Sequence, residues 1–171
     1  EETFIMPDED VTITVVVKTI TYTIDYNLNG GIVAINNKTS YTVETEDFTL
    51  NNPVKEGYTF TGWTGSNGTT PQITVTITKG SIGNKSYTAN YMPNTDTPYK
   101  VEHYKQNLEK NEYILVETQN LTGTTDTNVV AIPRVYTGFT YDSSVQGTIS
   151  NGVISADGSL VLKLYYTRNV H

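Results

Sequence analysis

The sequence predicts a mainly β protein of two small tandem domains, preceded by a strand left over from another module. Three observations predict this class. Apolar and polar residues alternate in several runs of the 171-residue chain, and a period of two is that of a half-buried strand. Tyr, with 13 copies, and Thr favour strands, while Asn-Gly pairs favour turns. No long run has the helical period of 3.6, and the best helix candidate is a short one over residues 106–112.

The first element lies within residues 1–18. Apolar residues alternate there at Val11, Ile13, Val15 and Val17, which predicts one strand whose partners are mostly absent. The chain also opens inside this pattern, without an initiator Met. We therefore expect residues 1–18 to close a preceding module, and the chain to be a piece of a longer protein.

The first predicted domain spans residues 19–92. Residues 20–28 alternate strictly, which places one set of side chains on a buried face: Ile20, Tyr22, Ile24, Tyr26 and Leu28. Asn29-Gly30-Gly31 follows at once and predicts a reversal of the chain. Asn67-Gly68 predicts a further turn, and residues 73–77 and 87–91 alternate again.

Residues 93–98 form the predicted linker, because Pro93 and Pro98 bracket small polar residues with little to add to a core. The second predicted domain, residues 99–171, ends on an alternating strand over residues 160–166 and has turn signals at Asn151-Gly152 and Asp157-Gly158. Both domains contain glycine-aromatic-threonine-aromatic, at residues 57–60 and 138–141. This repeated order predicts related architectures in series.

Composition excludes several classes of function. The net charge is −7 with no basic cluster, so we expect no binding to nucleic acid. The chain has no cysteine, which excludes disulfides and thiolate metal sites. No apolar run reaches the roughly 18 residues of a membrane helix, so we expect no membrane insertion by this segment.

Three separated motifs in residues 20–92 resemble one family. They are Tyr26-Asn27-Leu28-Asn29-Gly30-Gly31, then Pro53-Val54-Lys55-Glu56-Gly57-Tyr58-Thr59-Phe60-Thr61-Gly62-Trp63, then Tyr87-Thr88-Ala89-Asn90-Tyr91. In this order they resemble the Listeria–Bacteroides repeat, the internalin B-repeat type of module. The resemblance implies a β-grasp-like fold in tandem arrays on bacterial cell surfaces.

Residues 99–169 resemble a second family. Tyr99-Lys100-Val101-Glu102-His103-Tyr104, Leu121-Thr122-Gly123-Thr124, Tyr136-Thr137-Gly138-Phe139 and Leu160-Val161-Leu162-Lys163-Leu164-Tyr165-Tyr166 are similar to the mucin-binding-protein (MucBP) repeats. That resemblance implies a ubiquitin-like β-grasp module. The two resemblances together imply an extracellular location on the cell wall or surface of a Gram-positive bacterium.

Trp63 is the candidate ligand contact. Period two places it opposite Tyr58 and Phe60 unless a bulge intervenes, and an exposed tryptophan would stack on a glycan. The alternative is a packing anchor, the role that the resemblance implies for this position.

A Lys–Asn isopeptide crosslink is the candidate covalent feature. Lys100 and Lys163 lie on the first and last strands of the second domain, with Asn120 or Asn128 opposite. Such a bond requires an apolar setting that lowers the lysine pKa, and the alternative is ordinary exposed lysines.

Metal, cofactor and catalytic sites are not expected. The acidic clusters at residues 8–10 and 44–47 lack the EF-hand pattern, and solvated turns are the alternative to calcium sites. His103 and His171 have no HExxH, HxH or GxSxG spacing around them. We expect no catalytic residues and no cofactor.

The function that follows is structural. We expect a non-enzymatic stalk of rigid β-modules, contacting neighbouring modules of the parent protein and presenting a distal recognition domain. The alternative is direct adhesion to host mucin, glycan or matrix glycoprotein, through exposed aromatic side chains or an open sheet edge.

Overall fold

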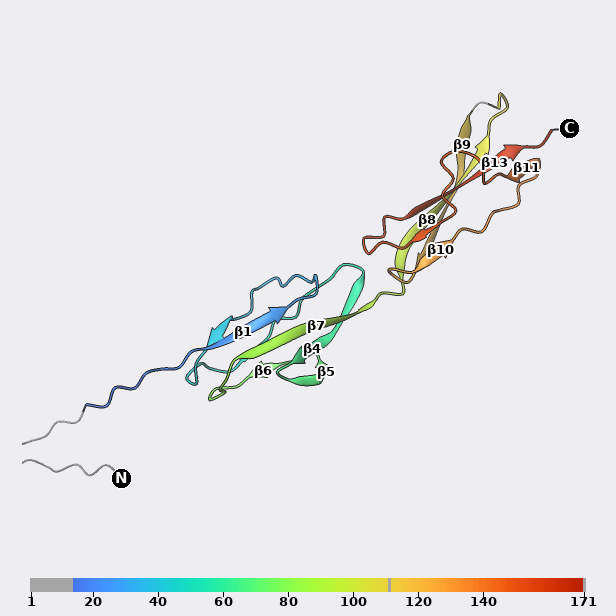
Figure 1. Cartoon of the computed structure of the whole chain (residues 1–171). Coiled ribbons are helices and arrows are strands. Elements are labelled where there is room, and N and C mark those ends of the chain that lie inside the picture. The colour runs from blue at the N-terminus through green and yellow to red at the C-terminus, as the bar shows by residue number, and fades with distance from the viewer. Residues whose placement is uncertain (1–13, 111, 171) are drawn as a thin grey trace, which may run out of the picture.

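The computed structural model describes residues 14–110 and 112–170, and this part of the chain contains β-strands and no helix. The all-β prediction is therefore confirmed. Figure 1 shows two groups of strands in succession, the first coloured blue to green and the second yellow-green to red. Each group has its own buried apolar cluster. We call residues 22–93 the N-terminal module and residues 97–168 the C-terminal module.

The N-terminal module is built on a five-stranded sheet in the order β2-β1-β7-β4-β5. Its central strands β1 and β7 are parallel, while β2, β4 and β5 are antiparallel to their neighbours. The short strands β3 and β6 form a separate pair. The strands are β1 (Tyr22–Asn27), β2 (Ser40–Tyr41), β3 (Phe48–Thr49), β4 (Tyr58–Gly65), β5 (Gly68–Gln72), β6 (Thr76–Ile77) and β7 (Lys85–Pro93).

The C-terminal module is built on a four-stranded sheet in the order β11-β13-β8-β9. Its central strands β8 and β13 are again parallel, and β9 and β11 are antiparallel to them. Strands β10 and β12 form a separate pair. The strands are β8 (Thr97–Gln106), β9 (Tyr113–Gly123), β10 (Asn128–Val130), β11 (Phe139–Tyr141), β12 (Asn151–Val153) and β13 (Val161–Arg168).

The two modules share one sheet arrangement. In each, the first strand lies parallel to the last, and a third strand lies antiparallel on the far side of the last. That third strand, β4 or β11, begins at the first aromatic residue of the motif that both modules repeat. The repeated sequence order thus corresponds to a repeated topology, which is compatible with the expected β-grasp architecture.

Alternation identifies the buried faces of the long strands. Ile24 is buried on β1, and Tyr22 and Tyr26 are half-buried on the same side, whereas Ile20 precedes the strand and is exposed. On β13, the predicted face is buried throughout the strand, as Leu162, Leu164 and Tyr166. Because every second side chain leaves water, β1 contributes Ile24 to the N-terminal core, and β13 contributes three of the five buried residues of the C-terminal core.

Several local predictions are wrong. Asn29-Gly30 forms a turn, but not a tight hairpin, because the antiparallel neighbour of β1 begins only at Ser40. Asn151-Gly152 lies within β12, where pairing with β10 overrides its turn preference. The short helix expected near residues 106–112 is absent from the described residues, since β8 continues to Gln106 and β9 resumes at Tyr113.

The N-terminal strand is not formed where the structure describes it. Residues 14–21 belong to no strand, and Val15, Val16 and Val17 are exposed because no strand of the described residues pairs with them. Residues 1–13, which include the acidic cluster at 8–10, lie outside the described residues, as does His171.

Candidate functional site: the joint between the modules

Trp63 is a core residue, so the prediction of a ligand-facing indole is wrong. A bulge between Phe60 and Gly62 shifts the register of β4 against β7 and rotates Trp63 onto the same face as Phe60. Its side chain is 0% exposed, and its Nε1 donates a hydrogen bond to Asn52 Oδ1 at 2.9 Å. The indole packs edge-on against neighbouring rings, with centroids 5.6–6.4 Å away, at Tyr26, Phe60 and Tyr87. No face of the ring is left for a ligand.

Three of the four residues considered for a crosslink, Lys100, Asn120 and Asn128, have exposed side chains, and Lys163 is half-buried. Lys100 on β8 does lie opposite Asn120 on β9, but both side chains are exposed. Asn128 is exposed on β10, and Lys163 on β13 lies opposite Glu102. Amide formation needs a desolvated lysine, so this arrangement does not support the predicted bond.

The acidic cluster at residues 44–47 has partners of its own. Glu46 forms an ion pair with Lys79 at 2.7 Å, and Asp47 Oδ1 accepts a hydrogen bond from the Lys79 backbone nitrogen at 2.7 Å. Within residues 14–110 and 112–170, no group of three or more acidic or histidine side chains could hold a metal ion. The cluster therefore closes a loop of the N-terminal module.

Several polar contacts connect the two modules, and we call this arrangement the joint. It consists of Gly57, Tyr58, Thr59 and Asn94 on the N-terminal side and Thr97, Thr125, Asp126 and Ala156 on the C-terminal side. Figure 1 shows that the two modules meet where β7 passes into β8. Only residues 94–96 of the predicted linker lie outside a strand.

The N-terminal half of the joint ties the end of β7 to the start of β4. The Asn94 backbone nitrogen donates to Gly57 O at 2.9 Å, and Thr59 Oγ1 donates to Asn94 Oδ1 at 2.7 Å. Gly57 has φ +73°, a left-handed conformation that glycine adopts without steric cost. This geometry directs the carbonyl groups of Gly57 and Asn94 toward the next module.

Thr125 of the C-terminal module donates a hydrogen bond to each of these two carbonyl oxygens. Its hydroxyl donates to Gly57 O at 2.8 Å, and its backbone nitrogen donates to Asn94 O at 3.0 Å. Because that hydroxyl has only one proton, the 2.6 Å contact with Thr97 Oγ1 is donated by Thr97. Thr125 and Thr97 are 1% and 4% exposed, so this chain of hydrogen bonds is shielded from water.

Packing and a second polar contact complete the joint. The Tyr58 hydroxyl donates to Asp126 Oδ2, and this hydrogen bond raises the pKa of the tyrosine. Lys55 Nζ lies 4.3 Å from the centroid of the Tyr58 ring, within cation–π range. Ala156 packs directly over Gly57, where a Cβ would lie only 2.6 Å from the Ala156 Cα. The arrangement can hold two modules in one orientation.

Sequence reasoning missed the joint because it treated residues 93–98 as polar residues that contribute nothing to a core. Thr97 is buried, and its partner Thr125 lies 28 residues away in the sequence. The one usable signal was the short linker together with the repeated motif at residues 57–60 and 138–141, which marks the same turn in both modules.

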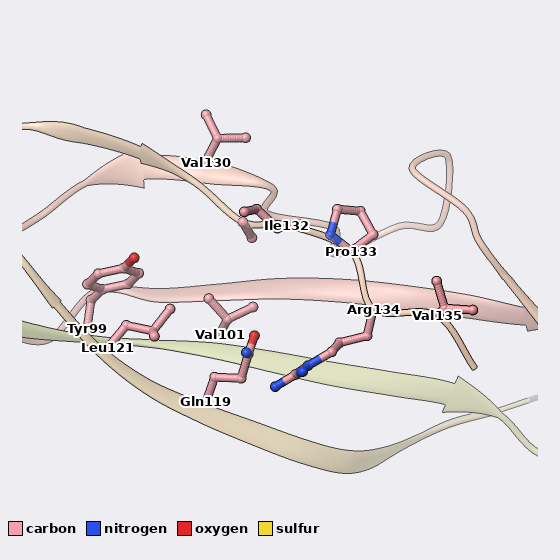
Figure 2. A pocket seen from close by; sticks show the side chains of 10 residues that line it. Tyr99, Val101, Gln119, Leu121, Val130, Ile132, Pro133, Arg134 and Val135 are labelled. Atoms are coloured by element: carbon pink, nitrogen blue, oxygen red, sulfur yellow. The ribbon is translucent and has the colours of Figure 1, made fainter.

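A groove on the C-terminal module is the second candidate site. It encloses about 450 Å³ between strands β8 and β9 and the segment 130–135. Figure 2 shows Tyr99 and Leu121 on the strand side, with Arg134 reaching across from the segment toward Gln119. Val130, Ile132 and Val135 on the segment are strongly exposed.

Polar side chains fix one wall of this groove. Arg134 Nη2 pairs with Glu117 Oε1 at 2.9 Å, and the Tyr136 hydroxyl donates to Glu117 Oε2 at 2.6 Å. The hydrogen bond from Tyr136 lowers the pKa of the Glu117 carboxyl, and Arg134 adds to the shift. Burial and the bond to Glu117 raise the pKa of Tyr136. These contacts anchor the segment to β9.

His103 lies beneath the segment and is a buried, hydrogen-bonded core residue. Tyr166 Oη accepts a bond from the Arg134 backbone nitrogen at 2.8 Å, so its proton points to His103 Nδ1, also at 2.8 Å. His103 Nε2 then donates to Gln119 Oε1 at 2.8 Å. Both ring nitrogens are therefore engaged in hydrogen bonds within the module, which leaves neither of them for a metal or a substrate.

Comparison with known proteins finds one family model that is similar to the N-terminal module. Residues 22–89 match the family model of the Listeria-Bacteroides repeat domain, inside the range that the motifs predicted. No curated protein matches the chain. A solved structure, Streptococcal High Identity Repeats in Tandem (SHIRT) domains 3-4 from a cell surface protein, aligns with 87% of this chain and 98% of that chain, at 10% identity and a TM-score of 0.30. The resemblance of residues 99–169 to MucBP repeats stays a prediction.

No helix long and apolar enough to cross a membrane is found among the described residues.

Proposed function

We propose that this chain is a non-enzymatic spacer segment of a bacterial cell-surface protein, in which the joint holds successive modules in a fixed orientation and so presents a distal recognition domain. The match of residues 22–89 to a repeat domain supports the repeat character and the surface location. The observation that carries the spacer role is the buried pair of hydrogen bonds from Thr125 to Gly57 and Asn94.

The proposed mechanism is mechanical. A hinge between modules is the ordinary expectation, because short polar linkers and small interfaces allow relative motion. Here the linker backbone itself is bonded to both modules, since Asn94 donates to Gly57 and accepts from Thr125. Each such bond contributes a net of about 0.5–1.5 kcal/mol, and opening the joint loses that contribution as the groups are exposed to water. Bending between the modules therefore costs more than a peptide linker alone would demand.

Spin-label distances test this proposal. The chain has no cysteine, so Thr70→Cys on β5 and Thr118→Cys on β9 place one label on an exposed position of each module. We expect a narrow distance distribution that Thr125→Val broadens. Thr122→Val is the matched control, because Thr122 is exposed and lies on β9 near the joint. A broad distribution in the unaltered joint contradicts the spacer proposal.

Adhesion is the second candidate function, and the groove on the C-terminal module favours it. Val130, Ile132 and Val135 expose apolar surface next to the ring of Tyr99, and exposed apolar patches are typical of binding sites. The partner class is a host mucin, glycan or matrix glycoprotein. Saturable binding to such a panel that Ile132→Ser abolishes would support it. Ile35→Ser, at an exposed position of the N-terminal module, is the control and should leave binding unchanged.

A further inference from the structure

The far end of the C-terminal module repeats the N-terminal half of the joint. The Asn169 backbone nitrogen donates to Gly138 O at 2.9 Å, and Thr140 Oγ1 donates to Asn169 Oδ1 at 2.8 Å. The corresponding bonds of Asn94 to Gly57 and of Thr59 to Asn94 measure 2.9 and 2.7 Å. Asn169 follows the end of β13 as Asn94 follows the end of β7.

This second half-joint has no module on it within the described residues. Gly138 has φ +81°, close to the +73° of Gly57. Among the described residues, a Cβ at Gly138 would meet no atom within 4 Å, whereas one at Gly57 would strike Ala156. Among the described residues, Gly138 O accepts only the bond from Asn169, while Gly57 O accepts a second bond from Thr125.

We propose that the surface formed by Gly138, Phe139, Thr140 and Asn169 is a docking site for a further module of the same kind as residues 97–169. The incoming module would donate to Gly138 O and Asn169 O from the equivalent of Thr125, and cover Gly138 with the equivalent of Ala156. The inference rests on the proposed spacer function and extends it, because it makes the joint a repeating element.

One difference in sequence distinguishes the second half-joint from the N-terminal half of the joint. Phe139 stands in the place of Tyr58, and its ring has no hydroxyl to donate to an aspartate equivalent to Asp126. Instead, Arg168 lies with its Cζ 4.8 Å from the centroid of the Phe139 ring, and its buried Nε has no hydrogen-bond partner among the described residues. In the proposed second joint, the terminal amino groups of this guanidinium would take the place of the Tyr58 hydroxyl and donate to the incoming carboxylate.

Chain spacing provides a direct test. Thr97, the first residue of β8, is three residues beyond Asn94. A second copy of residues 97–171 joined directly after His171 places its Thr97 three residues beyond Asn169. Spin labels at Thr118→Cys in both copies report on the second joint, and labels at Thr70→Cys and the first Thr118→Cys report on the first joint.

We expect narrow distance distributions across both joints of the extended chain. Gly138→Ala should broaden the second distribution and leave the first unchanged, and so should Thr125→Val placed only in the added copy, which does not alter Gly138. If the distances across the second joint are broadly distributed in the unaltered extended chain, or if neither variant changes their distribution, this inference is overturned. A narrow distribution across the first joint would still support the spacer proposal in that case. A broad first distribution contradicts the spacer proposal itself.

Discussion

Replacing Gly57 by alanine is expected to open the joint while leaving the N-terminal module folded. The new Cβ would lie 2.6 Å from Ala156 Cα and 2.8 Å from Ala156 O, both backbone atoms that cannot move aside alone. Separating the modules breaks the two hydrogen bonds that Thr125 donates to Gly57 and Asn94. At about 0.5–1.5 kcal/mol each, the loss is about 1–3 kcal/mol of joint stability.

Gly138→Ala is the matched control for this prediction. Its φ of +81° is close to the +73° of Gly57, so both variants carry the cost of a left-handed alanine, about 1–2 kcal/mol. A Cβ at Gly138 meets no atom of the described part of the chain within 4 Å. The difference between the two variants therefore isolates the contact with Ala156.

Residual dipolar couplings and urea unfolding together measure both effects. We expect each variant to lower the unfolding free energy of its own module by about 1–2 kcal/mol, with Trp63 fluorescence reporting on the N-terminal module. Only Gly57→Ala should give the modules different alignment tensors. Unchanged couplings in Gly57→Ala would refute the reasoning, and so would an equal loss of common alignment in Gly138→Ala.

Three further predictions concern the interiors and one loop. Asn52→Ala removes the acceptor of the Trp63 indole and should cost about 1–3 kcal/mol, measured by urea unfolding with tryptophan fluorescence; an unchanged midpoint would contradict the assigned bond. Tyr166→Phe removes the acceptor of the Arg134 amide, so hydrogen exchange at that amide should accelerate, and unchanged exchange would argue against this contact. Hydrogen bonds from two flanking serines lower the pKa of Asp157 to about 2. Its carboxylate therefore contributes stability above its unfolded pKa of about 3.9 that is lost as the pH falls toward 2; Asp157→Asn should flatten this part of the pH–stability profile, and an unaltered profile would speak against the shift.

The alternation of apolar and polar residues predicted those strands in which every second side chain is buried over many residues. On β13, Leu162, Leu164 and Tyr166 all face the core because nothing interrupts the period of two. The motif at residues 57–60 and 138–141 likewise identified the equivalent strands β4 and β11. These features depend on residues that are close together in the sequence, so they can be predicted from the sequence alone.

Features set by distant contacts were missed. A bulge between Phe60 and Gly62 reverses the face on which Trp63 lies, and its position depends on pairing with β7. Asn151-Gly152 was predicted as a turn because its partner strand β10 could not be identified. The joint draws on Gly57 and Thr125, which are 68 residues apart, and neither residue type signals an interface by itself.

The most direct test of the spacer proposal is a set of residual dipolar couplings measured on the unaltered chain in one alignment medium. If the joint holds as proposed, couplings from residues 22–93 and 97–168 fit one alignment tensor together with the geometry of the structure. Two tensors of different magnitude would show that the modules move independently, and would contradict the proposal that this segment is a rigid spacer.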